Sequence, residues 1–196
     1  MNRREAISRL ALLMGGAIVG AEAFVNGSVL PGQPTGPGFS ARDLALMDEI
    51  GETILPATST PGAKAIGIGA FMAMMVNDCY DPAHQAIFRA GLLAVDAGAQ
   101  SQFGCSFVDA LPAQRSSLLK KIDADARSHH DAQASGAPSH YFRLMKEITI
   151  LGYFTSEAGC TQALRYLEVP GSFSGDVPYK KGDRAWYTVP TRNLSD

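Results

Sequence analysis

Three cysteines are the first side chains that could carry chemistry, as metal ligands, redox groups or nucleophiles. Cys79, Cys105 and Cys160 form no Cys-x-x-Cys pair and show no Cys–His spacing typical of a zinc site. We therefore expect inert, buried thiols. In an oxidising compartment two alternatives stay open, a disulfide within the chain or a bridge to a partner, and Cys160 is the first candidate for the bridge.

The four histidines are potential metal ligands or general bases. His129 and His130 stand in a polar stretch without carboxylates or thiols at regular spacing, which favours a solvated loop over a metal site. His84 falls in the first turn of an expected helix, and His140 stands where another helix should begin. The histidine pattern predicts no catalytic base.

Nucleotide and nucleophile motifs are incomplete. The run 67–69 is Gly-Ile-Gly, but the third glycine of a dinucleotide loop is replaced by Met72, which favours a turn between helices. The run 171–175 carries phenylalanine where a nucleophilic serine would stand. Glu147 and Glu157 lie nearly three turns apart on an expected helix, too far for an acid–base pair. We expect no catalytic, cofactor or metal site in this chain.

Apolar residues at spacings of three and four predict the helices that must position these side chains. Ser40 with Asp43 resembles a capping box, Asp81-Pro82 is a strong helix start, and Gly104 should end the helix that follows. The expected helices cover about 40–55, 70–80, 82–103, 112–128 and the stretch from about 141. The expected fold is all-α, a single small domain of about five helices with an irregular, aromatic, Gly/Pro-rich C-terminal tail.

The N-terminus resembles an export signal of the twin-arginine type. Arg3 and Arg4 precede an uncharged apolar run at 10–19, and Ala-Glu-Ala at 21–23 is a small-x-small cleavage site. Alternatives are an uncleaved anchor or an amphipathic helix. The expected organisation is a signal at 1–23, a linker at 24–39, a helical domain at 40–165 and a tail at 166–196.

Composition excludes several classes of protein. The 196 residues are 46% hydrophobic and 18% charged, which is typical of a folded domain rather than a disordered chain. A formal net charge of −2 provides no basic field for nucleic acid. The only long apolar run is N-terminal, so we expect membrane association only through partners.

Residues 151–160, which we call the distinctive stretch, are the most unusual part of the sequence. It combines two glycines with the adjacent aromatic residues Tyr153 and Phe154, and aromatic residues recur in the tail at Tyr166 and Trp186. This pattern indicates a docking surface, although the same side chains could merely cover a small core. Glu157 is a candidate for a bond to the backbone or to an arginine of a partner.

Several motifs, in this order, resemble the gluconate 2-dehydrogenase subunit 3 family. They are the twin arginines with their apolar run, Ile-Leu-Pro-Ala-Thr at 54–58, Thr-Pro-Gly-Ala at 60–63, Asp-Cys-Tyr at 78–80, Phe-Arg-Leu-Met-Lys-Glu at 142–147, Leu-Gly-Tyr-Phe-Thr-Ser-Glu at 151–157 and Arg-Ala-Trp at 184–186. The resemblance implies a small, non-catalytic subunit of an FAD-dependent dehydrogenase acting on sugars, polyols or glycosides. It places the flavin and the catalytic histidine in a large partner of the glucose-methanol-choline type.

The resemblance also implies further partners and a location. Some such complexes include a cytochrome c, with haem c or an iron–sulfur cluster outside this chain, and the route of export is to the periplasm. Contacts to the partner are expected from Tyr153, Phe154, Cys160, Tyr166 and Trp186. Two other hypotheses are a stand-alone periplasmic chaperone-like or binding protein without a redox partner, and a free-standing enzyme with an unrecognised site.

Overall fold

A computed structural model describes residues 38–132, 138–167, 169 and 175–187. The expected export signal with Arg3 and Arg4, and the expected linker up to residue 37, lie outside these residues. Contacts divide the chain into the units Met1–Pro34 and Thr35–Asp196, and all described residues belong to the second unit.

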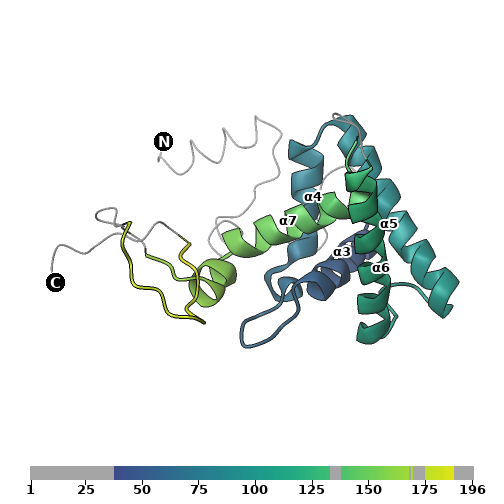
Figure 1. Cartoon of the computed structure of the whole chain (residues 1–196). Coiled ribbons are helices and arrows are strands. Elements are labelled where there is room, and N and C mark those ends of the chain that lie inside the picture. Colours follow the sequence, from purple (N-terminus) through teal and green to yellow (C-terminus); the bar gives the residue numbers. More distant parts are fainter. Residues whose placement is uncertain (1–37, 133–137, 168, 170–174, 188–196) are drawn as a thin grey trace, which may run out of the picture. The chain divides into compact units, whose positions relative to one another are not determined.

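The described residues confirm the all-α class. They form five α-helices, α3 (Ala41–Ile54), α4 (Ile68–Cys79), α5 (Pro82–Phe103), α6 (Pro112–Asp131) and α7 (Tyr141–Thr155) (Figure 1). A short 3₁₀-helix, η1 (Ala63–Ile66), precedes α4, and a π-helix, η2 (Gly159–Ala163), follows α7. No β-strand occurs in the described part of the chain.

Local capping explains where α3 and α5 begin and end. The Asp43 amide donates to the Ser40 hydroxyl at 3.2 Å, and the Ser40 amide donates to the Asp43 carboxylate at 2.8 Å. This reciprocal pair is the predicted capping box. Asp81 accepts a bond from the His84 amide at 2.9 Å at the start of α5, and Gly104, with φ of 72°, ends that helix. All three sequence predictions are confirmed.

Two helix boundaries differ from the sequence prediction. Helix α4 begins at Ile68 rather than near residue 70, because Gly67 adopts the left-handed conformation (φ 68°) and lets the chain turn directly into the helix. Helix α6 continues to Asp131, so the prediction of a loop from His129 was wrong. The polar run before Gly136 contains no helix breaker, and polarity alone does not end a helix.

The core lies around α7, which packs against α3, α4, α5 and α6 (Figure 1). Met145 of α7 is fully buried, as are Met47 of α3, Met72 of α4 and Phe88 of α5. Close approach of α5 to the start of α7 requires a glycine, because a Cβ at Gly91 would lie 2.5 Å from the Tyr141 ring. Within the described residues no helix is long and apolar enough to cross a membrane.

His140 links the stability of α7 to pH. Its Nδ1 accepts a bond from the Phe142 amide at 3.2 Å, so the imidazole must be neutral to cap the helix. Its ring lies 4.2 Å from that of Tyr141 and 5.7 Å from that of His129. Burial and the neighbouring His129 lower the pKa of His140, while Asp125 opposes this shift.

We expect the free energy of unfolding to fall as the pH drops from about 6.5 through the lower folded-state pKa of His140. The unfolded chain binds this proton more readily, so the stabilisation is fully present above the unfolded pKa and is lost in acid. Urea unfolding from pH 8 to pH 5 measures the effect. His140→Asn keeps a capping side chain that does not titrate, so it should alter stability at pH 8 by less than about 1 kcal/mol and flatten the pH profile. An unchanged slope would contradict this role.

Candidate partner interface

The residues expected to contact a partner lie where α7 ends and the chain turns into η2. Helix α7 ends at Thr155, and Ser156 adopts an extended conformation before η2 begins at Gly159. Glu157 therefore lies beyond α7, and the prediction that it shares a helix with Glu147 was wrong. This change of direction carries the chain from α7 to the C-terminal residues (Figure 1).

Hydrogen bonds hold together the turn between α7 and η2, residues 153–160, which we call the corner. The Ser156 hydroxyl donates to the Tyr153 carbonyl at 2.6 Å and accepts a bond from the Gly159 amide at 3.1 Å. The Cys160 thiol is buried and donates to the Phe154 carbonyl at 3.2 Å. The corner is therefore a defined structure, held by the Ser and Cys of the distinctive stretch.

Tyr153 anchors the end of α7 to the loop between α3 and η1. The side chain is only 4% exposed, and its hydroxyl donates to the Pro61 carbonyl at 2.7 Å and lies 3.3 Å from the Thr60 hydroxyl. The adjacent Gly152 meets α4 closely, since a Cβ there would lie 2.5 Å from the Phe71 ring. These two members of the distinctive stretch have structural roles in the domain.

Tyr153→Phe should lower the free energy of unfolding by about 1 kcal/mol, because the Pro61 carbonyl loses its donor while packing of the ring is kept. Denaturant unfolding monitored by circular dichroism measures this difference. Tyr179→Phe is the matched control, because the Tyr179 side chain is 79% exposed. Equal stabilities of the two variants would show that the hydrogen bond of the Tyr153 hydroxyl does not contribute to the free energy of unfolding.

The other candidate contact residues are accessible to different degrees. Glu157 and Tyr166 are exposed, and Phe154 and Trp186 are half-buried. Phe154 packs edge-on against Tyr153 with ring centroids 5.2 Å apart. The corner thus brings together Tyr153, Phe154, Glu157 and Cys160, and the contact role of all six residues stays a prediction. Any contact of Tyr153 or Cys160 with a partner requires that the buried side chain become accessible.

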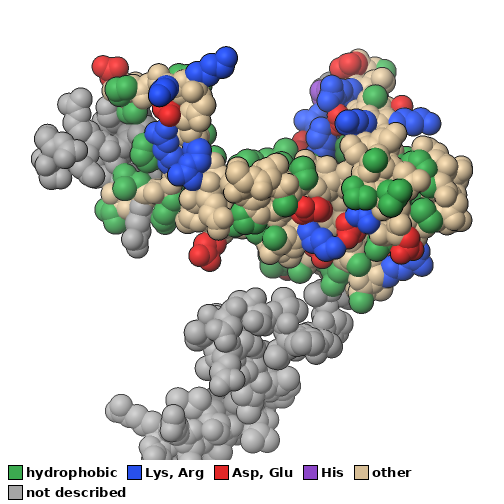
Figure 2. All heavy atoms as spheres, turned by 90° about the horizontal axis from the view of Figure 1, so that it is seen from below, with side chains coloured by type: hydrophobic (Ala, Val, Ile, Leu, Met, Phe, Trp, Pro, Cys, Tyr) green, Lys and Arg blue, Asp and Glu red, His purple; other side chains and the backbone are tan. Residues whose placement is uncertain are grey.

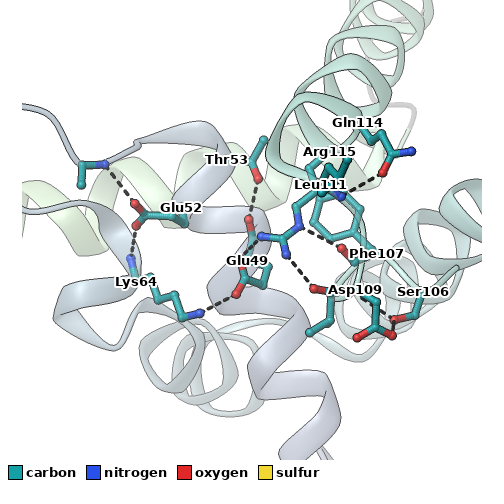
Figure 3. Close-up of polar contacts among 12 residues, drawn as sticks. Glu49, Glu52, Thr53, Lys64, Ser106, Phe107, Asp109, Leu111, Gln114 and Arg115 are labelled. Carbon is teal, nitrogen blue, oxygen red and sulfur yellow. Dashed lines mark hydrogen bonds and ion pairs between the residues drawn. The ribbon is translucent and has the colours of Figure 1, made fainter. Parts of the chain in front are cut away.

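A charged cluster elsewhere in the domain was not predicted from the sequence (Figure 3). Glu49 of α3 is only 8% exposed and forms ion pairs with Arg115 of α6 and with Lys64 of η1, the latter at 2.5 Å. The Arg115 guanidinium also donates to the carbonyls of Phe107 at 3.0 Å and Val108 at 2.6 Å. The hydrogen bond to Glu49 raises the pKa of Lys64.

The hydrogen bonds of this cluster join three separate elements of the domain. Both Glu49 oxygens are engaged by cations, and the Arg115 guanidinium donates through each of its three nitrogens. Glu52 beside it accepts the amides of Ala57 and Lys64 at 2.9 Å each. Through these contacts the cluster ties α3, η1 and α6 together.

A groove between α6 and α7 is the other concentration of charge. It has a volume of about 360 Å³, and five of its charged side chains form ion pairs. Asp123 binds Lys146 and Arg127 at 2.6 Å each, and Arg143 binds Glu147 at 2.8 Å. The hydrogen bond from Lys146 keeps the pKa of Asp123 below its usual range. Acids and bases balance, so the groove selects no particular charge.

The remaining cysteines and histidines form no metal-binding group within the described residues. Cys79 is exposed at the end of α4 and Cys105 is half-buried after α5, so the expectation of buried thiols was wrong for these two and is met by Cys160 alone. His84 lies in the first turn of α5, as predicted, and its Nδ1 lies 2.6 Å from the Asp81 carboxylate. Across the described part of the chain, no three His, Cys, Asp or Glu side chains are grouped so that they could hold a metal ion.

Together these features define a small all-α domain whose distinctive sequence stretch forms a corner beside accessible aromatic side chains. The family model for gluconate 2-dehydrogenase subunit 3 matches residues 41–171, and the chain belongs to this family. The match runs from the start of α3 past η2, so it includes the helical domain and the corner. No curated protein and no solved structure matched the chain. The family description makes the chain an accessory subunit of a dehydrogenase complex, with a catalytic partner.

Proposed function

We propose that this chain is the non-catalytic small subunit of an exported, FAD-dependent sugar, polyol or glycoside dehydrogenase. It binds a flavoprotein of the glucose-methanol-choline type, stabilises it and accompanies it through the twin-arginine route to the periplasm. The observation that carries this proposal is the family match over residues 41–171.

The character of the described residues supports a binding role. The buried charged cluster is fully paired, and the charges of the α6–α7 groove balance. Large apolar side chains remain exposed at Ile150 and Leu151 on α7 and at Tyr166 beyond η2, near the corner. Exposed apolar side chains that lie close together are typical of protein–protein interfaces.

The N-terminal sequence supports the export role. Arg3 and Arg4 with the apolar run match a route that carries folded proteins. This route is suited to proteins that bind a cofactor before export. We find no cofactor motif in this chain, whereas a flavoprotein bound to it would need such a route. One signal would then serve both subunits.

Affinity isolation of the full-length, tagged chain from its native periplasm tests the proposal. We expect a larger subunit to co-elute with the absorption bands of oxidised flavin, and the complex to oxidise a sugar or polyol with an artificial electron acceptor. Deleting the gene for this chain should leave the flavoprotein in the cytoplasm.

A colourless chain without a partner would overturn the subunit role and favour a stand-alone binding protein. If the flavoprotein reaches the periplasm equally well in a strain that lacks this chain, the export role alone is overturned. Activity of the isolated chain would point instead to a free-standing enzyme.

A further inference from the structure

A loop beyond η2 is closed at its base by backbone hydrogen bonds. We use the name C-terminal loop for the described residues 164–167 and 175–187 alone. The Arg165 amide donates to the Ala185 carbonyl at 2.8 Å, and the Tyr187 amide donates to the Arg165 carbonyl at 2.9 Å. The Arg184 guanidinium donates to the Gln162 carbonyl at 2.6 Å, which fastens this base to η2 and thus to the corner.

A tight turn inside the loop presents two lysines. The Asp183 amide donates to the Lys180 carbonyl at 2.9 Å, and the Lys180 amide donates to the Asp183 carboxylate at 3.0 Å. Gly182 has φ of 94°, which a side chain would disfavour. Lys180 and Lys181 are both exposed, and neither has an ion pair within the described residues.

Within the described residues of the loop, no acidic side chain forms an ion pair with these lysines. Asp183 is engaged by the turn and by Arg165, whose guanidinium lies 3.2 Å from the carboxylate. The same guanidinium lies 5.3 Å from the centre of the Trp186 ring. Asp176 is the other acid in the described part of the loop. Figure 2 shows Lys and Arg side chains gathered over this end of the molecule.

Exposed apolar side chains accompany the lysines. Tyr179 is 79% exposed, Tyr166 49% and Tyr187 42%. Residues of the loop also line a hollow of about 430 Å³, among them Val177 and Trp186. Exposed aromatic rings, uncompensated cations and a concavity together are typical of protein interfaces.

We propose that the C-terminal loop docks on an acidic, partly apolar face of the flavoprotein subunit. Lys180 and Lys181 meet carboxylates of that face, and an apolar side chain of the partner enters the hollow beside Trp186. The inference rests on the proposed function and specifies the surface and the charge that serve it. Complementary charge would speed association and fix the orientation of the two subunits.

A protein partner fits these observations better than an anionic membrane. A membrane-binding loop needs cations and exposed aromatic rings but no concavity. The described residues of this loop line a hollow, and hydrogen bonds hold the turn at 180–183 and join Arg165 to residues 185–187. Both properties serve a partner of defined shape.

Charge reversal of two lysine pairs tests the proposal. Lys180→Glu/Lys181→Glu changes the loop, and Lys120→Glu/Lys121→Glu on α6 is the matched control, with two adjacent, exposed lysines that have no ion pair in the described residues. Each full-length variant is co-expressed with the flavoprotein, and dissociation of the isolated complex is measured on dilution at low and at high NaCl.

We expect the loop variant to weaken the complex by about tenfold or more at low salt, with a smaller difference at high salt. The control variant should stay within about twofold of the original chain, and both variants should keep its melting temperature. Equal weakening by both pairs, or none by the loop pair, would overturn the docking role while leaving the subunit role intact.

Two further results separate the remaining explanations. Lysine-dependent co-sedimentation with vesicles of phosphatidylcholine and phosphatidylglycerol, without weakening of the complex, would replace the protein partner by a membrane. Failure of the original chain to bind any flavoprotein would overturn the proposed function and this inference with it.

Discussion

Arg115→Ala should lower the free energy of unfolding by about 3–5 kcal/mol. Glu49, a residue only 8% exposed, would lose its main partner, and the carbonyls of Phe107 and Val108 would lose their donors. Lys64 would remain as the single cation beside Glu49, and 54% of its side chain is open to solvent. Denaturant unfolding at pH 7, followed by circular dichroism, measures the loss.

Arg42→Ala is the matched control for this prediction. Arg42 pairs with Asp96 at 3.0 Å, but 72% of the Arg42 side chain is exposed, so the loss should stay below about 1 kcal/mol. Glu49→Leu combined with Arg115→Met removes both buried charges and should recover part of the stability lost by the single variant. If Arg115→Ala and Arg42→Ala cost the same, the buried cluster does not hold α3 against α6.

Where helices begin could be predicted best from the sequence. Ser40, Asp81 and Pro82 act on the backbone within three residues, so their effect is visible without knowledge of the rest of the fold. Helix ends were harder to predict. Asp131 ends a polar run in which no residue type stops a helix. Thr155 precedes Ser156, whose hydroxyl bonds to Tyr153 and Gly159 end the helix, but a serine at this point does not by itself distinguish a helix end from a helix interior.

The distinctive stretch could be found from the sequence, but which of its residues are buried and which are accessible could not be predicted. Two glycines and two adjacent aromatic residues signal an unusual backbone, yet only the structure shows that Tyr153 is buried and Glu157 exposed. The Glu49 cluster was missed because its members lie in three separate segments. One signal was present: Glu49 follows the buried Leu46 by three residues and so falls on the apolar side of α3.

Gly159→Ala should disrupt the corner between α7 and η2. A Cβ at residue 159 would lie 1.8 Å from the Tyr153 carbonyl oxygen and 3.0 Å from the Phe154 Cα. These are backbone atoms, so no side chain can move aside and the main chain itself must shift. We expect a loss of about 3 kcal/mol in the free energy of unfolding, the upper part of the usual cost of overpacking. Thermal and denaturant unfolding measure the loss.

Gly98→Ala is the control, because a Cβ at this position in α5 would meet only the flexible end of Leu118, at 3.4 Å. Replacing a glycine inside a helix should here raise stability by about 0.5–1 kcal/mol. Similar effects of the two substitutions would contradict the steric argument.

The Gly159→Ala substitution should disturb η2 and, with it, the proposed docking surface. Amide hydrogen exchange should accelerate at Cys160 and Leu164, whose N–H groups bond to the carbonyls of Ser156 and Gly159, and should stay slow in the middle of α7. Because the C-terminal loop is fastened to η2 through Arg184, displacing η2 displaces the loop as well. Gly159→Ala should therefore weaken the complex with the flavoprotein under conditions where the helical domain is still folded. Full binding by a folded Gly159→Ala chain would mean that the corner does not position the docking surface.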